Sequence, residues 1–219
     1  MRLNELQLTK DIKAAEFPQP GKITPGARVK DILAKYGWEV KGYGVEGAVA
    51  VHPKTDAILK LFIYDSKYKH FVSLAKNHPN IHFPVFYKDI KDIPGTKFSY
   101  IMMENLNKIS TEQLMKDFLP EMCVIYLNRV KHKIEYLFSY EISHYVKQAI
   151  GVSLKSSMVN KPDILWNKFG RKPDEQWFDA VDEIFKTASK IGLEDVDLYV
   201  SGNNIMLRGK TLVIIDPFI

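Results

Sequence analysis

The chain has 219 residues, of which 46% are hydrophobic and 26% charged, and its formal net charge is +5. These values are typical of a globular protein, and no apolar run is long enough to span a bilayer. Its single cysteine, Cys123, excludes an internal disulfide and a cysteine-based zinc site, and the start of the chain lacks the apolar core of a secretion signal. We therefore expect a cytoplasmic protein. The lysines are scattered along the sequence, which favours a solvated surface over a nucleic-acid groove.

The first part of the chain is predicted to be rich in strands. Residues 1–27 end in a run of prolines and glycines, which predicts an arm that packs on the body or stays mobile. Residues 28–36 carry apolar side chains at helical spacing, and Gly37 ends this predicted helix. The pattern then predicts strands at 38–40, 48–52, 57–64, 84–89 and 98–103, a turn at 92–95, and a helix over 66–77.

The pattern becomes helical from Thr111. Amphipathic runs predict helices over 111–128, 130–152 and 174–191. The chain then closes with two apolar strands, 205–207 and 212–215, around a turn that contains Gly209. We therefore predict an α+β fold with an arm at 1–27, a β-rich lobe at 28–104 and a helical lobe at 105–219.

The closing hairpin carries polar side chains at one end. Asn204 stands at its entry and Asp216 at its exit. An amide oxygen and a carboxylate at the same end of a hairpin are what a divalent cation holding a polyphosphate requires. An ordinary surface hairpin with asparagine at a turn is the alternative.

A glycine pattern, Gly42-x-Gly44-x-x-Gly47-x-Val49, lies between two predicted strands. Glycines let backbone N–H groups approach phosphate oxygens without a Cβ in the way. A hairpin turn that uses glycine for its backbone conformation would leave the same pattern.

Lys60 stands in the middle of an apolar strand. Alternation along the strand places it on one face with Ile58 and Phe62, where a lysine is costly unless an anion meets it. We interpret Lys60 as an anion-binding residue, and a side chain that extends to solvent at the sheet margin is the alternative.

In this order the motifs resemble the protein-kinase family over about residues 36–219. The resemblance implies a two-lobed fold that binds ATP and Mg²⁺ between its lobes. The closing hairpin, with its Asn-Ile-Met-Leu-Arg and Ile-Asp-Pro-Phe segments, is closest to compact kinase-like proteins encoded by tailed bacteriophages. The resemblance implies these roles: Gly42, Gly44 and Gly47 in the loop over the phosphates, Lys60 on the α- and β-phosphates, Met103 and Glu104 in the hinge that meets adenine, and Asn204 and Asp216 on the metal.

Three departures from the family pattern qualify this interpretation. Asp197 has the context of the catalytic aspartate but lies two residues too far from Asn204, so either the loop has an insertion and Asp197 is the base, or the base is absent. No glutamate lies between Glu46 and Glu104, so the helix after the lysine strand cannot supply the usual partner of Lys60, and Asp65 is a weak substitute. The sequence stops three residues after Asp216, so we expect a lobe truncated after the metal-binding motif, without an activation segment or peptide platform.

Two functions follow from the resemblance. In the first, the protein is a kinase-like phosphotransferase that moves the γ-phosphoryl group of Mg-ATP to a Ser or Thr hydroxyl of a host protein, with Asp197 and Lys60 as catalytic residues. In the second, it is a pseudokinase that acts by binding and modulating a host protein in the host cytoplasm.

Overall fold

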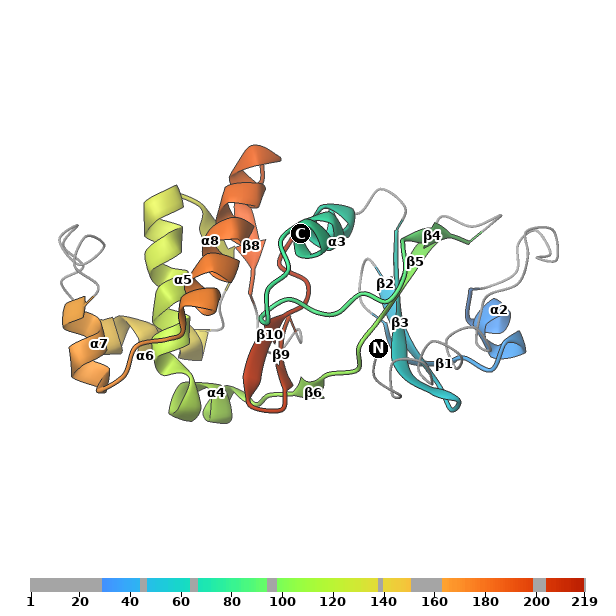
Figure 1. Cartoon of the computed structure of the whole chain (residues 1–219), viewed down its shortest axis with the longest axis horizontal. Helices are drawn as coiled ribbons and strands as arrows, with labels where there is room; N and C mark the ends of the chain where they lie inside the picture. The colour runs from blue at the N-terminus through green and yellow to red at the C-terminus, as the bar shows by residue number, and fades with distance from the viewer. Residues whose placement is uncertain are drawn as a thin grey trace. The chain divides into compact units, whose positions relative to one another are not determined.

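The computed structural model describes residues 29–43, 47–63, 67–93, 98–137, 140–150, 163–198 and 204–218. Within these residues the chain is an α+β protein, as the sequence predicts, and it divides into two compact units (Figure 1). The described residues up to Lys69, together with Val85–Asn105, form the first unit. His70–Pro84 and the described residues from Leu106 onward form the second. The predicted division after residue 104 differs from these units because residues 70–84 group with the second, and the predicted arm at 1–27 lies outside the described residues.

The first unit contains an antiparallel sheet with the strand order β1-β2-β3-β5-β4. Its elements are α2 (Val29–Lys35), β1 (Glu39–Tyr43), β2 (Gly47–His52), β3 (Thr55–Ile63), β4 (Lys91–Asp92) and β5 (Phe98–Met103). The strand predicted at 84–89 is reduced to one isolated bridge, between Phe86 and Met103, and β4 lies partly where a turn was predicted.

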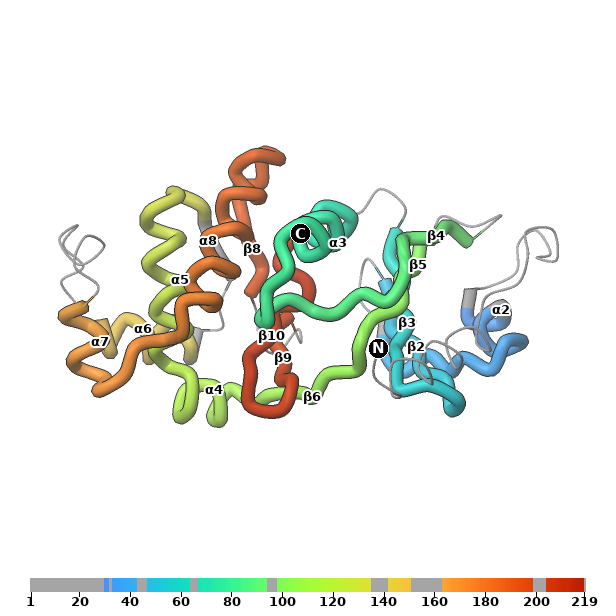
Figure 2. The backbone as a smooth tube through the Cα atoms, viewed as in Figure 1, coloured from blue at the N-terminus to red at the C-terminus, as the bar shows by residue number. Residues whose placement is uncertain are grey.

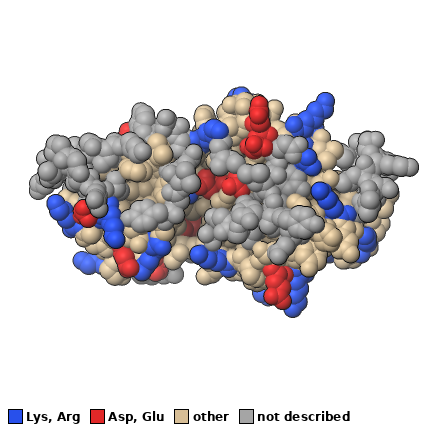
Figure 3. Space-filling model, turned by 180° about the vertical axis from the view of Figure 1, so that it is seen from behind, with Lys and Arg blue, Asp and Glu red and all other residues tan. Residues whose placement is uncertain are grey.

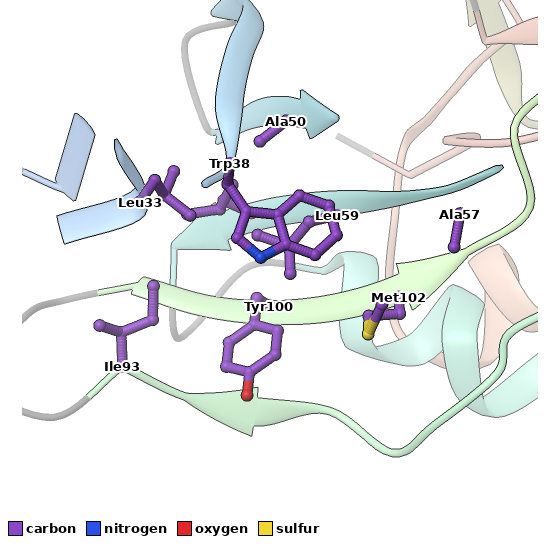
Figure 4. Close-up of a cluster of buried hydrophobic side chains, with 9 residues drawn as sticks. Leu33, Trp38, Ala50, Ala57, Leu59, Ile93, Tyr100 and Met102 are labelled. Atoms are coloured by element: carbon purple, nitrogen blue, oxygen red, sulfur yellow. The ribbon is translucent and has the colours of Figure 1, made fainter. Parts of the chain in front are cut away.

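Alternation along β3 gives the sheet two different faces. Ala57, Leu59 and Leu61 are each 1% exposed and pack in the core cluster with Trp38 (Figure 4). The intervening positions place Lys60 on the opposite face, as the sequence predicts, and its side chain is half-buried. The core therefore fixes the strand, and with it the position of Lys60.

Helix α3 (Tyr68–Asn77) begins slightly later than predicted, and residues 64–66 lie outside the described part of the chain. Its buried Phe71 contacts Phe83 and Phe218 edge-on, with ring centroids 5.8 and 6.2 Å away. The end of the described chain therefore lies beside α3, as the backbone trace also shows (Figure 2).

The second unit is mainly helical. Its elements are β6 (Asn107–Lys108), α4 (Thr111–Asp117), α5 (Leu119–His132), β7 (Glu135–Leu137), α6 (Tyr140–Ile150), α7 (Asp163–Phe169), α8 (Glu175–Lys190), β8 (Asp195–Asp197), β9 (Ile205–Arg208) and β10 (Thr211–Ile214). The helix predicted at 111–128 is instead two helices, α4 and α5, which meet at Phe118. Pro120 lies in the first turn of α5. Proline is well suited to the start of a helix because its missing N–H has no helical acceptor there.

The run predicted as one helix over 130–152 also contains a strand. Lys133, in the left-handed backbone region with φ 54°, ends α5, and β7 follows and pairs in parallel with β8. The predicted closing hairpin is present as β9 and β10, with Gly209 at φ 61° in its turn, and β6 extends it to three strands. In the part of the chain that the structure describes, no helix is both long and apolar enough to cross a membrane.

Candidate functional site

Hydrogen bonds join Asp197 and Asn204 to each other and to the residues on both sides of Asp216. The Nδ2 of Asn204 donates to the backbone oxygen of Asp197 at 3.4 Å, and the backbone oxygen of Asn204 accepts from the N–H of Ile215 at 2.8 Å. The N–H of Asp197 donates to the oxygen of Pro217 at 2.8 Å. Asp197, Asn204 and the residues on both sides of Asp216 therefore lie together in the second unit, and Asn203 lies outside the described residues.

The donor atoms of this site suit a hard divalent cation. Because the Nδ2 of Asn204 donates to Asp197, its Oδ1 is the atom left to act as a ligand. Asn204 and Asp216 are both half-buried, and together they offer an amide oxygen and a carboxylate. Mg²⁺ is typically held by one or two such groups together with substrate phosphates. Among the described residues, no three His, Cys, Asp or Glu side chains cluster as a larger metal cage would need.

A segment that the sequence did not single out holds this hairpin in place. His82 is 3% exposed, and its Nδ1 lies 2.7 Å from the backbone oxygen of Leu212 in β10. Its own backbone oxygen accepts from the N–H of Ile214 at 2.9 Å. The guanidinium of Arg208 donates to the backbone oxygens of Ile81 and Phe83 at 2.8 and 3.0 Å. The residues just after α3 therefore act as a brace along the hairpin that carries Asn204 and Asp216.

His82 also connects the hairpin to α8. Its Nε2 lies 3.1 Å from both carboxylate oxygens of Asp174, which caps the N-terminus of α8 through the N–H of Trp177. Spacing along the chain gives no signal for this role, since the partners of His82 lie 92 and 130 residues later.

Lys60 lies in the first unit, at the centre of β3, where it is paired in register with Val49 and Ile101. Its Nζ lies 5.0 Å from the centroid of the Tyr68 ring. Tyr68 is the first residue of α3 and was assigned no role by the sequence. The predicted substitute partner, Asp65, lies outside the described residues.

The predicted glycine loop is described at two of its three glycines. Gly42 is exposed, and a Cβ built on it would meet nothing within 4 Å. A Cβ on Gly47 would overlap the backbone oxygen of Leu61 in the neighbouring strand. The fold therefore demands glycine at 47 but not at 42, and Gly44 lies outside the described residues.

The predicted hinge is anchored to the segment before it. The N–H of Glu104 donates to the oxygen of Val85 at 3.0 Å, and the Glu104 Oε1 accepts from the N–H of Val85 at 2.8 Å. Met103 is fully buried at the end of β5. An adenine contact through Glu104 would therefore use its backbone oxygen, because its N–H already has an acceptor.

The candidate residues fall into one group in each unit. The first unit holds Gly42, Gly47, Lys60, Met103 and Glu104, and the second holds Asp197, Asn204 and Asp216.

On the face seen in Figure 3, the Lys and Arg side chains of the described residues are spread out and do not gather in one patch, as the scattered lysines predict.

Comparison with known proteins gives a likeness only among solved structures. No protein-family model matches the sequence, and no curated protein matches it. A structure of the streptomycin–ATP–APH(2")-IIa ternary complex is similar at 16% identity and a TM-score of 0.36, over 89% of this chain and 71% of that one. A structure of vaccinia related kinase 3 is similar at 14% identity and a TM-score of 0.24, over 55% of this chain and 44% of that one. Both TM-scores are below 0.5, so neither likeness decides a role for any residue of this chain.

Proposed function

We propose that this chain is a kinase-like protein that binds Mg-ATP. Asn204 and Asp216 would hold the metal, and Lys60 would contact the phosphates, with Gly42, Gly44 and Gly47 close to them and Met103 and Glu104 near the adenine. The observation that carries the proposal is the hydrogen-bonded set of Asp197, Asn204, Ile215 and Pro217. These bonds bring the backbone of Asp197 close to Asn204 and to the residues on both sides of Asp216, which supports a metal site at this end of the closing hairpin.

The same set supports phosphotransfer with Asp197 as the acceptor-orienting base. Mg-ATP, when bound, would supply the phosphoryl group and neutralise part of its charge. Asp197 would take the proton of an attacking hydroxyl as the hydroxyl oxygen bonds to the γ-phosphorus and ADP departs. The bond from Asn204 to the backbone of Asp197 favours the interpretation in which the intervening loop has an insertion and the base is retained.

We further propose that the acceptor is a Ser or Thr hydroxyl of a host protein, with the chain encoded by a bacteriophage and acting in the host cytoplasm. The support for this is the resemblance of the closing hairpin to compact phage-encoded kinase-like proteins.

A pseudokinase that modulates a host protein is the second candidate. The observation that favours it is in α3, where Tyr68–Asn77 contains no acidic residue to pair with Lys60. Such a protein would keep nucleotide binding without phosphotransfer.

Thermal unfolding with and without Mg-ATP tests the binding proposal. At a ligand concentration of roughly 100 times Kd, binding stabilises the native state by about 2.7 kcal/mol, which should raise Tm by roughly 5–10 °C. Asp216→Asn should abolish the shift, and Asp195→Asn, a half-buried carboxylate on β8, should retain it. A wild-type Tm that Mg-ATP leaves unchanged would refute the proposal.

Labelled ATP separates the two candidates once binding is established. A kinase should transfer label to a protein in a bacterial extract, and Asp197→Asn should lose the transfer while it keeps the Mg-ATP shift in Tm. If the wild type binds Mg-ATP but labels neither itself nor the extract, the pseudokinase is the correct alternative.

A further inference from the structure

An aromatic side chain of the first unit, Tyr68, contacts the ammonium group of Lys60. The Nζ of Lys60 lies 5.0 Å from the centroid of the Tyr68 ring, within the range of about 6 Å over which a ring face attracts a cation. Tyr68 is 1% exposed and Lys60 is half-buried, so water is partly excluded from the contact. Partial desolvation strengthens the attraction of the ring for the ammonium group.

Tyr68 is fixed in place by its neighbours. Its hydroxyl donates to the Sδ of Met103 at 3.7 Å, and its ring lies against Phe62 with centroids 5.0 Å apart. A third contact, with Phe86, is edge-on at 6.4 Å. These partners come from β3, from β5 and from the bridge segment beside β5, so the ring presents a fixed surface to Lys60.

An aromatic ring acts on a lysine differently from a carboxylate. A carboxylate holds the ammonium group by opposing its charge, whereas the uncharged ring orients the group and leaves its charge in place. The contact with the ring therefore takes away none of the positive charge by which a lysine attracts a polyphosphate.

We propose that Tyr68 is a positioning residue that orients Lys60 through its ring face for contact with a polyphosphate. The inference rests on the proposed function, because it names the group that prepares Lys60 for the phosphates of ATP. Tyr68 itself touches Lys60 and not the ligand.

The ring contact can be measured without any nucleotide. In the free protein, the Hε signals of Lys60, assigned by their loss in Lys60→Met, should lie upfield of those of other lysines because of the Tyr68 ring current. Tyr68→Phe should retain this upfield position and Tyr68→Leu should abolish it. Equal Lys60 Hε shifts in the wild type and Tyr68→Leu would overturn the proposal.

The functional part is tested by comparing ligands that differ in their phosphates. Tyr68→Leu should weaken Mg-ATP binding by about three- to tenfold more than it weakens adenosine binding. Tyr68→Phe should behave as the wild type. Equal losses for adenosine and Mg-ATP would show a merely structural role and overturn the proposal.

Fluorinated phenylalanines at position 68 keep the shape of the ring and avoid any loss of folding. Each added fluorine weakens the negative face of the ring, so the affinity for Mg-ATP should fall stepwise with fluorine number. An affinity independent of fluorination would overturn the proposal.

Tripolyphosphate as a probe separates failure of the inference from failure of the proposed function. If the wild type binds no nucleotide, the proposed function is wrong, and the inference then predicts tripolyphosphate binding that falls with fluorination. Absence of tripolyphosphate binding would overturn the inference as well.

Discussion

At the scale of single residues, glycines from one motif are present for different physical reasons. Gly47 gives room to the backbone oxygen of Leu61, so the sheet itself requires it. Gly42 has open space where its side chain would be, so packing gives no reason for it. Close approach of a ligand to the backbone would explain why residue 42 is glycine.

Alanine should therefore reduce stability at position 47 and ligand binding at position 42. Gly47→Ala should lower the free energy of unfolding by about 1–3 kcal/mol, because a strand must move away from its neighbour. Gly42→Ala should change it by less than about 0.5 kcal/mol but weaken Mg-ATP binding roughly tenfold, the equivalent of one lost backbone contact. Urea unfolding and calorimetric titration measure the two effects. An unchanged Kd for Gly42→Ala would remove Gly42 from the phosphate site.

The interval between Asp197 and Asn204 shows what a residue count can miss. Counting along the chain left two alternatives open, an insertion or an absent base. The hydrogen bonds place Asp197 beside Asn204 in space whatever the length of the loop between them. Sequence could identify both residues but not their proximity.

At the scale of elements, the sequence was sufficient to predict structures whose parts are contiguous along the chain. The hairpin of β9 and β10 could be predicted because both strands and their turn are contiguous. Alternation along β3 likewise placed Lys60 on the correct face. The strand β7 was missed because its partner, β8, follows only after three helices. The contact of Tyr68 with Lys60 was missed because a side-chain contact across two elements leaves no periodic signal.

The contact between α5 and α8 contains a charged network centred on Asp182. Its carboxylate accepts from Lys131 at 2.6 Å and lies 2.9 Å from the Nε2 of His132, both on α5, and 2.8 Å from Lys186 on α8. Burial raises the pKa of Asp182, but the hydrogen bonds from Lys131, Lys186 and His132 outweigh it and hold the pKa well below its ordinary value. A lowered folded-state pKa stabilises the protein above the unfolded-state value of about 3.9, and this stabilisation is lost as the pH falls below it.

Asp182→Asn should therefore lower stability at neutral pH by about 1 kcal/mol and reduce the acid sensitivity of the protein. The difference in Tm between the wild type and Asp182→Asn should narrow as the pH falls from 7 to 3. Glu183→Gln, which alters a neighbouring carboxylate bonded to Lys186 alone among the described residues, is the matched control. A difference in Tm that is constant across this range would contradict the role given to Asp182.

At the scale of the whole molecule, the compact units do not follow the order of the chain. Residues 70–77 of α3 and the brace after them belong to the same unit as the C-terminal segment, where Phe71 contacts Phe218 and His82 bonds to β10. A polypeptide cut after residue 105 would therefore lose Phe218, which contacts the Phe71 ring, and Leu212, whose backbone oxygen lies against the His82 ring.

A fragment of residues 28–105 should accordingly not fold as an independent domain. Without Phe218 against Phe71 and without the hydrogen bonds that hold residues 81–83, it should bind ANS and unfold without a cooperative transition. Adding residues 106–219 as a second fragment should reduce the ANS fluorescence. A cooperative transition without ANS binding in the isolated fragment would contradict this prediction.

The bonds from His82 to β10 also constrain how the protein is made. The ring of His82 and the oxygen of Leu212 are 130 residues apart in sequence, so this contact closes a long loop. At a synthesis rate of about 5–20 residues per second, roughly 7–26 s separate the appearance of the two partners. During this interval the Phe71 ring also lacks its contact with Phe218. The contact between His82 and β10 can therefore form only after Leu212 has been synthesised.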